Sequence, residues 1–328
     1  MEWNINQYRG SSYHIGVSES LDVSEDILMK LKILENNRSP WEGIKQLQTF
    51  APHIIEELQG VADGLGWSLK KTAARFAGCN LPCSLAMGCS SFIDKRFAVR
   101  NYDFSPDCYD HRLTLIQPDK AFASAGTSLH IVGRHEGVNE KGLFTALHFV
   151  NNKGAKEGFA ATMIVRIVLD KCENTQQAIT LLKKLPHAWN YNYSLSDQHG
   201  DMAVVEAGPE RMRIIKGKGK ITCTNHFKGS TVKEDFTRSI FRKQVMDQKN
   251  FTSITEAFHY FSDETSPLFY QDYLHSFGTL HTFGYDNMTG RVYIALPFGE
   301  CVTIDWNCWV KGENVTQNRL YGRYLQKE

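Results

Sequence analysis

The pattern of apolar and polar positions divides the chain into a helical first part and a strand-rich remainder. Apolar residues recur at helical spacing between residues 22 and 77, which predicts a series of amphipathic helices. Residues 8–20 precede them and predict a short β-rich opening. A break at Ser39-Pro40 predicts a new helix with Ser39 as its N-cap, and Ser68 is expected to cap a third helix. These helices are expected to form a separate covering segment.

Beyond residue 88 the pattern changes to short apolar runs bounded by turn residues, which is typical of strands. After a first hairpin, strands are predicted over 113–117, 129–133, 144–150, 191–196, 202–207, 212–216, 221–225, 279–285 and 291–296. Helices are predicted over 158–172, 175–185 and 232–261. Strand blocks on both sides of a helix pair predict an α+β fold of four layers, αββα, with two stacked sheets covered by helices.

Charge and hydropathy exclude several classes of protein. The 37 basic and 36 acidic residues nearly cancel, which argues against a nucleic-acid or membrane-surface partner. No apolar run approaches the roughly 20 residues that span a bilayer. The polar N-terminus lacks the basic and then apolar pattern of a signal peptide. We therefore expect a cytoplasmic protein that acts on a small molecule.

The cysteines are too dispersed for the disulfide framework of a small secreted domain. They stand at positions 79, 83, 89, 108, 172, 223, 301 and 308. Most are expected to be reduced and buried. Cys79, Cys83 and Cys89 lack the paired Cys-x-x-Cys spacing of zinc sites, so we predict no metal.

Cys89 stands apart from the other cysteines because residues 89–104 predict a β-hairpin with its turn at residues 94–95. In that register Cys89 lies directly opposite Arg100, and opposed residues have Cβ atoms about 5 Å apart. A guanidinium at that distance favours the thiolate and is expected to lower the pKa of the cysteine.

A cysteine at a chain's N-terminus would carry two useful groups, a nucleophilic thiol and an α-amine with an ordinary pKa of about 7.7–8.0. The amine can accept the thiol proton and later deliver it to a leaving group. Freeing this amine requires cleavage between Gly88 and Cys89. The glycine permits strained backbone conformations there. Asp103, three residues past Arg100, could hold the ammonium through a charge-assisted hydrogen bond.

The same residues resemble a known signature. Gly88–Ser91 followed by Arg100–Asp103 is similar to the N-terminal-nucleophile hydrolases of the conjugated bile acid hydrolase and penicillin V acylase group. Residues 52–64 resemble the helix ahead of the cleavage site in the acyl-coenzyme A:6-aminopenicillanic acid acyltransferase branch. Asn139–Leu143 and Thr224–His226 also match the wider group.

The resemblance implies a role for each matching residue. Cys89 would be the nucleophile in self-cleavage and catalysis, with Arg100 and Asp103 tuning and orienting it. Asn225 would offer its side-chain amide to the oxyanion, and the backbone N–H of His148, where bile acid hydrolases have asparagine, would be the second donor.

Arg238 matches the family's second site arginine, although Arg242 lies one turn further along the same predicted helix. The resemblance also implies that residues 1–88 are a helical precursor segment packed on a catalytic domain of residues 89–328.

The expected activity is that of an autoprocessed cysteine amidase that cleaves a linear amide through a thioester acyl-enzyme. Two alternatives stay open: acyl transfer to an amine, with a coenzyme A thioester as a potential co-substrate, and a non-catalytic binding protein that is never cleaved. Otherwise no cofactor is expected. Related enzymes are often multimers, which leaves a homo-oligomer open.

Other candidate residues have plainer interpretations. Cys79 also follows a glycine, but no Arg-Asn-Tyr-Asp run follows it at hairpin distance. No nucleophile elbow surrounds Ser90 or Ser91. His275 and His281 flank the start of a predicted strand and are expected to be structural histidines.

Overall fold

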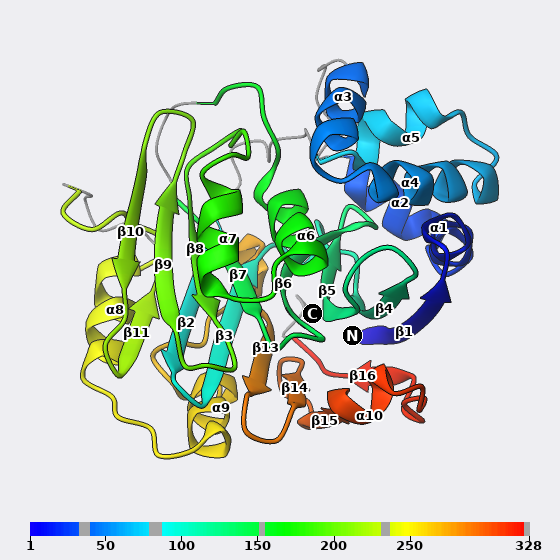
Figure 1. Cartoon of the computed structure of the whole chain (residues 1–328). Coiled ribbons are helices and arrows are strands. Elements are labelled where there is room, and N and C mark those ends of the chain that lie inside the picture. The colour runs from blue at the N-terminus through cyan, green and yellow to red at the C-terminus, as the bar shows by residue number, and fades with distance from the viewer. Residues whose placement is uncertain (33–39, 79–86, 151–154, 231–236, 325–328) are drawn as a thin grey trace.

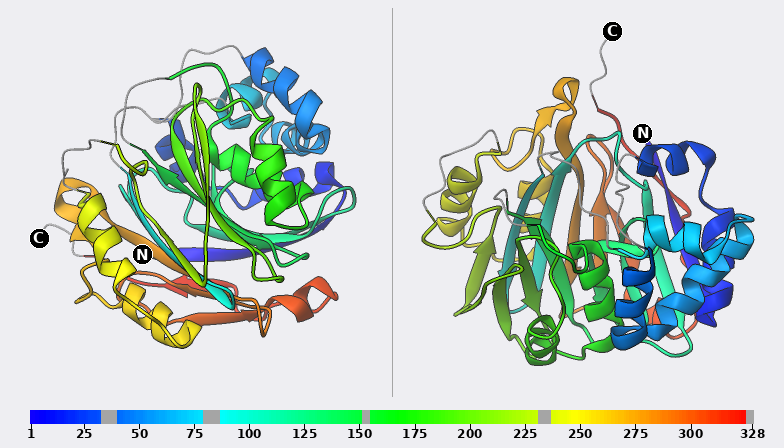
Figure 2. Two further views of the ribbon diagram at one scale, coloured as in Figure 1. Left: turned by 60° about the vertical axis from the view of Figure 1, so that its left-hand side comes forward. Right: turned by 90° about the horizontal axis from the view of Figure 1, so that it is seen from above.

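The computed structural model describes residues 1–32, 40–78, 87–150, 155–230 and 237–324, and Ser39, Cys79 and Cys83 fall outside these ranges. Within them, two β-sheets stack face to face and carry helices on their outer surfaces (Figures 1 and 2). The predicted α+β arrangement of two stacked sheets covered by helices is therefore confirmed.

The larger sheet contains nine strands in the described part of the chain. Their order is β10 (Met212–Lys216), β9 (Met202–Ala207), β8 (Tyr191–Ser196), β7 (Phe144–Phe149), β6 (Gly133–Asn139), β5 (Ser124–Leu129), β4 (Arg112–Pro118), β1 (Glu2–Gly10) and β16 (Arg319–Tyr321). Two helices cover its outer face, α6 (Ala161–Lys171) and α7 (Thr175–Leu182).

The second sheet holds the predicted hairpin. Its order in the described ranges is β11 (Lys220–Cys223), β2 (Gly88–Asp94), β3 (Phe97–Phe104), β13 (Phe277–Asp286), β14 (Arg291–Ala295) and β15 (Val302–Asp305), with β12 (Gln271–Asp272) paired to β13. Two helices pack on this sheet, α8 (Ser239–Asp247) and α9 (Ile254–Ser262). Two short helices complete this half, the 3₁₀ turn η2 (Tyr273–His275) and α10 (Trp306–Val310).

The first part of the chain is not entirely helical, which corrects the prediction of a helical segment there. Strand β1 lies within the larger sheet, parallel to β4 over Asn4–Gly10. Beyond Gly10 the chain forms a helix where a β-rich segment was predicted, because the Ser11 hydroxyl caps it by accepting from the His14 N–H. The helices are α1 (Ser12–Leu21), α2 (Glu25–Leu31), α3 (Pro40–Phe50), α4 (Pro52–Gly64) and α5 (Leu69–Phe76). The Ser68 cap of α5 is confirmed.

Buried charges fix this helical part to the rest of the fold. The Glu57 carboxylate of α4 accepts two hydrogen bonds from the Arg166 guanidinium of α6, at 2.8 and 2.6 Å. Arg166 also pairs with Asp170, whose carboxylate contacts the His53 ring of α4 at 2.8 Å. Breaking a buried pair by removing one partner typically costs about 3–5 kcal/mol. None of these contacts would be cut by cleavage between residues 88 and 89.

Strand pairing differs from the prediction at two places. In the hairpin Cys89 pairs with Tyr102, and Arg100 pairs with Ser91 instead, a shift of two residues. The two residues between the strands are Lys95 and Arg96, one position later than predicted, and the Asp94 carboxylate accepts hydrogen bonds from the Arg96 main chain and side chain. An even shift leaves every side chain on its original face, so Arg100 still projects beside Cys89.

The predicted strand over 129–133 is wrong. His130 and Ile131 have φ values of 60° and 64°, and this segment is the turn between β5 and β6. Strands β8, β9 and β10 occupy the predicted ranges. The next strand, β11, leaves that sheet and pairs with β2. Of the single helix predicted over 232–261, residues 232–236 lie outside the described ranges, and the described part forms two helices, α8 and α9.

Candidate active site

Cys89 lies near the start of β2 and is fully buried between the sheets. Its Sγ accepts a hydrogen bond from Arg100 Nη2 at 3.2 Å, and its main-chain N–H donates to Asn225 Oδ1 at 2.8 Å. The structure therefore brings Asn225, which is distant in sequence, to the hairpin that carries Cys89 and Arg100. The prediction of a lowered thiol pKa is wrong for the uncleaved chain: burial raises the pKa of Cys89, and the charges of Arg100 and Arg242 only partly oppose it.

A buried carboxylate holds Arg100 in place. Arg100 Nη1 pairs with Glu136 of β6, and Nη2 donates to the Leu147 carbonyl at 2.7 Å. Glu136 also contacts His281 Nε2 at 2.9 Å and accepts from the Thr127 hydroxyl. Burial alone would raise the pKa of Glu136, but His281 and Arg100 hold it well below its usual value. The carboxylate is therefore ionised and fixes the guanidinium beside the thiol.

The second arginine of the site is Arg242 and not Arg238, which corrects the prediction. Arg238 is exposed at the start of α8, in a left-handed conformation with φ 50°. Its guanidinium lies over the Phe241 ring, 4.2 Å from the ring centroid. Because α8 begins at Ser239, the residue one turn later points inward, and Arg242 is completely buried.

Arg242 joins three polar groups near Cys89. Its guanidinium donates to Asn225 Oδ1 and to the Ser90 hydroxyl, each at 2.7 Å, and lies 3.4 Å from an Asp103 oxygen. The sequence identified Arg242 only as a residue one turn from Arg238, which matches the family. The structure distinguishes the two arginines by which face of α8 packs toward the sheet.

The groups that donate hydrogen bonds to Asn225 fix the orientation of its side-chain amide. A main-chain N–H and a guanidinium can only donate, so the atom between Cys89 and Arg242 is the amide oxygen. The amide nitrogen donates to the Phe149 carbonyl at 2.9 Å. A hydrogen bond from Asn225 also lowers the thiol pKa, against the larger effect of burial.

The main chain of His148 does not face Cys89, contrary to prediction. The Val150 N–H donates to the Asn190 carbonyl at 3.0 Å, and the register pairs His148 with Asn192. Along a strand of an antiparallel ladder, the main-chain N–H groups point alternately to the two neighbouring sides, so the N–H groups of residues two apart along β7 point to the same side. The His148 N–H therefore points to β8, and the N–H groups on the side of Cys89 belong to Leu147 and Phe149.

The His148 side chain nevertheless belongs to the site. Its Nε2 contacts the hydroxyls of Ser194 at 2.8 Å and Ser91 at 3.2 Å. Burial, together with the positive charges of Arg100 and Arg242, holds the pKa of His148 well below its usual value. The ring is therefore neutral and connects β7 to the strand that carries Cys89.

Position 88 requires glycine because a side chain would have no room there, and not because of the backbone conformation. A Cβ at this position would lie 2.9 Å from Asp103 Oδ2 and 2.9 Å from the Phe277 ring. Asp103 lies opposite Gly88 in the ladder and accepts a hydrogen bond from Thr279 at 2.7 Å. Burial raises the pKa of Asp103, while Arg242 and Thr279 oppose the rise. The carboxylate thus lies beside the residue that precedes Cys89.

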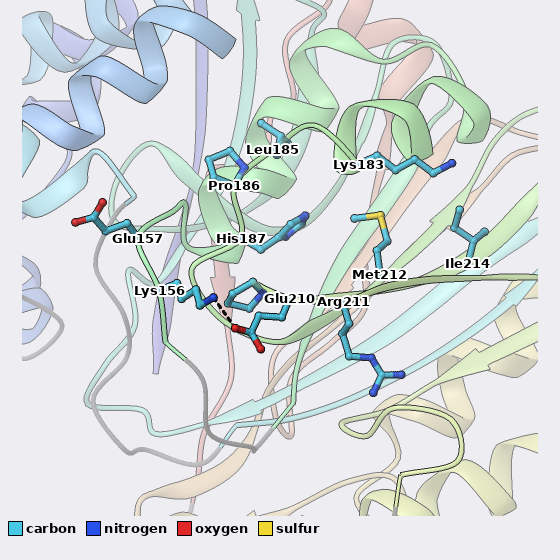
Figure 3. A pocket seen from close by; sticks show the side chains of 12 residues that line it. Lys156, Glu157, Lys183, Leu185, Pro186, His187, Glu210, Arg211, Met212 and Ile214 are labelled. Atoms are coloured by element: carbon cyan, nitrogen blue, oxygen red, sulfur yellow. Dashed lines mark hydrogen bonds and ion pairs between the residues drawn. The ribbon is translucent and has the colours of Figure 1, made fainter.

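A cavity of about 710 Å³ lies away from Cys89, between the end of α7 and the β9–β10 turn (Figure 3). Two of the charged side chains that line it, Lys156 and Glu210, form an ion pair. None of the residues that contact Cys89 lines it, so it is not the candidate active site.

Two further observations concern metals and membranes. No group of three or more His, Cys, Asp or Glu side chains suited to a metal ion occurs within the ranges given above. In the same ranges, every helix is too short or too polar to cross a bilayer.

The stacked-sheet fold and the residues around Cys89 agree with the N-terminal-nucleophile class that the sequence resembles. The family model for acyl-coenzyme A:6-aminopenicillanic acid acyl-transferase matches residues 93–299, which is more than half of the chain. The chain therefore belongs to this family, and the predicted resemblance to that branch is confirmed. It is accordingly an enzyme of acyl-group chemistry. The matched range contains Arg100, Asp103, Asn225 and Arg242, and begins shortly after Cys89.

Solved structures of three enzymes are similar at low scores, and no curated protein matches the sequence. Penicillin V acylase from Agrobacterium tumefaciens is 18% identical, covering 66% of this chain and 86% of that chain, with a TM-score of 0.41. A mutant conjugated bile acid hydrolase from Clostridium perfringens is 15% identical, covering 72% and 97%, with a TM-score of 0.43. The Caenorhabditis elegans ortholog of N-acylethanolamine-hydrolyzing acid amidase is 9% identical, covering 60% and 92%, with a TM-score of 0.42. None of the three assigns a role to a residue of this chain.

The two arginines of α8 provide a matched test of the site. Arg242→Ala leaves the Asp103 carboxylate buried without its guanidinium and is expected to lower the free energy of unfolding by about 3–5 kcal/mol. Arg238→Ala removes an exposed charge and is expected to change it by less than about 0.5 kcal/mol. Urea unfolding of both variants measures this difference. Equal effects would contradict the assignment of Arg242.

Proposed function

We propose that this chain is an autoprocessed cysteine amidase in which Cys89 forms a thioester acyl-enzyme. One observation carries the proposal: a buried cysteine that follows a glycine has a fixed guanidinium at its sulfur and an asparagine oxygen at its N–H. These groups occur in a chain of an acyl-transferase family.

Self-cleavage would proceed by an acyl shift from nitrogen to sulfur. Cys89 Sγ attacks the Gly88 carbonyl carbon, the bond from that carbon to the Cys89 nitrogen breaks, and the thiol proton ends on this nitrogen. Water then hydrolyses the thioester, releasing the Gly88 carboxylate and restoring the thiol. Asn225 Oδ1, which already accepts from the Cys89 N–H, is placed to receive the new ammonium group.

Catalysis would repeat this sequence with an external amide. The α-amine of Cys89 takes the thiol proton as sulfur attacks the substrate carbonyl, and returns it to the leaving amine. The Phe149 N–H replaces that of His148 as the proposed main-chain donor to the oxyanion. It lies on the same side of β7 as the Phe149 carbonyl that binds the Asn225 amide, so both donors would be adjacent.

Hydrolysis and acyl transfer differ only in what attacks the thioester. A coenzyme A thioester would reach the same acyl-enzyme without releasing an amine, so it serves as a second acyl donor in the test.

Product partition separates the two activities. Cleaved protein with a chromogenic N-acyl amide is expected to release the amine and the free acid. With added acceptor amine or amino acid, an amidase continues to form mostly acid, whereas an acyltransferase forms mainly the new amide. Quantifying both products by mass spectrometry decides between them. An uncleaved chain without cysteine-dependent turnover of either donor would contradict both activities and favour a binding protein.

A further inference from the structure

Met87, two residues before Cys89, lines a mainly apolar cavity of small free volume. The side chain is buried, and the Tyr102 hydroxyl donates to its Sδ at 3.6 Å. The cavity's other apolar walls include Phe104, Leu129 and Leu147. About 20 Å³ stays free beside Met87, which is close to the space of a single water. Side chains therefore take up most of the space here, among them the flexible, unbranched side chain of Met87.

The position of this cavity relates it to the proposed chemistry. Tyr102 is the direct ladder partner of Cys89, and the Leu147 carbonyl accepts from the same Arg100 nitrogen that contacts the thiol. The cavity therefore adjoins the sulfur through two of its walls.

Self-cleavage and substrate turnover pass through the same kind of intermediate. In both, a carbonyl carbon is bonded to Cys89 Sγ, and in self-cleavage that carbonyl belongs to Gly88. An acyl group delivered by a substrate would then occupy the place that Gly88 and Met87 hold in the uncleaved chain.

We propose that this cavity is the acyl pocket of the cleaved enzyme and that Met87 occupies it beforehand as an internal model of the acyl chain. The inference rests on the proposed function and adds its substrate class: amides of unbranched aliphatic acids of medium length. Before cleavage the pocket is closed to substrate by the chain's own side chain.

Gly88 indicates which acyl groups fit next to the carbonyl carbon. Its Cα corresponds to the α-carbon of the acyl group, where an added carbon would meet Asp103 and Phe277 at 2.9 Å. Overpacking of this kind typically costs about 1–3 kcal/mol. Acyl groups with an α-methyl branch are therefore expected to be poor substrates.

The Met87 side chain indicates the length of the acyl chain that the pocket accepts. From the Gly88 carbonyl carbon, the covalent path through the main chain to the end of the Met87 side chain contains roughly nine atoms. Leu129 lines the cavity that this path enters. Acyl chains of about eight to ten carbons should fill the pocket, and longer chains should not fit.

A chain-length series tests the pocket directly. Cleaved protein is assayed with N-acyl p-nitroanilides from acetyl to dodecanoyl and with 2-methyloctanoyl p-nitroanilide. kcat/KM is expected to rise about threefold to fourfold per methylene, to peak near octanoyl to decanoyl and then to fall. The α-methyl compound is expected to be slower than octanoyl by about tenfold or more.

Leu129→Ala lengthens the pocket, so the optimum should move to longer chains. Leu195→Ala, a buried leucine of β8 that does not line the cavity, removes the same atoms and should leave the optimum unchanged. A flat chain-length profile in an otherwise active, cleaved enzyme overturns the pocket alone, as does an equal shift in both variants. Absence of cleavage and of all amidase activity overturns the proposed function instead.

Met87 variants give a second measurement should Leu129→Ala not fold. Met87→Ala is expected to slow cleavage at Gly88 by roughly 10²-fold, because the scissile carbonyl loses its anchor beside the thiol. Met29→Ala, at an exposed methionine of α2, should cleave at the normal rate. Equal cleavage rates in the two variants would contradict occupation of the pocket by Met87.

Discussion

Cys89→Ala is expected to yield an uncleaved chain with no measurable amide hydrolysis. The substitution removes the proposed nucleophile of both reactions while adding no bulk to the buried position between the sheets. Loss of a nucleophile that acts together with its base typically costs on the order of 10⁶ in kcat. Intact-mass measurement detects self-cleavage, and an amidase assay with a medium-chain anilide measures amide hydrolysis.

Cys172→Ala is the matched control for this substitution. Cys172 is also a buried, free cysteine, at the end of α6, so its replacement tests loss of an interior thiol in general. The control should be cleaved and active. Cleavage in Cys89→Ala at the rate of the control would show that another group performs the first reaction.

Glu136→Gln is expected to have the second largest effect. The carboxylate is the partner that fixes Arg100 beside the sulfur, and a neutral amide leaves a guanidinium buried without its counter-ion. Destabilisation by about 3–5 kcal/mol is expected. Self-cleavage should slow by about 10²-fold or more, since small displacements of a positioned group have effects of this size.

Glu57→Gln separates positioning from stability. It breaks an equally buried carboxylate–guanidinium pair, with Arg166, in the contact between α4 and α6. Both variants should lose free energy of unfolding in urea, Glu57→Gln the less because Arg166 keeps its pair with Asp170, but only Glu136→Gln should cleave slowly under conditions where each is folded. If the two variants cleave at the same rate, Glu136 has only a structural role.

The sequence predicted the part of the site that is local in the chain. Gly88, Cys89, Arg100 and Asp103 belong to one hairpin, and alternation along a strand kept the arginine on the cysteine's face despite the error in register. The position of the turn was not predictable from residue types alone, because it depends on the hydrogen bonds that the Asp94 side chain accepts from Arg96.

The distant part of the site depends on packing that no local pattern contains. Glu136 and His281 lie on different sheets and meet only because the sheets stack. Glu136 lies in β6, a buried strand that the apolar pattern did not predict. Arg242 and Arg238 are separated by one helical turn, and only the start of α8 decides which one faces Cys89.

The first strand escaped prediction for a related reason. Residues 2–10 alternate weakly, and β1 is stabilised by partners at both edges, β4 and β16, that lie far along the chain. Strands of this kind depend on tertiary pairing more than on intrinsic preference. The β8–β10 meander, whose turns are short and local, was predicted with its observed bounds.

The central claim is that one residue supplies both the nucleophilic sulfur and, after cleavage, the amine that serves as its base. Intact-mass measurement of the purified wild-type chain, combined with sequencing of the new N-terminus, tests it most directly. The account predicts fragments of 88 and 328 − 88 = 240 residues, the larger beginning with Cys89. A single species at 37.3 kDa, or a new N-terminus at any other residue, would contradict it.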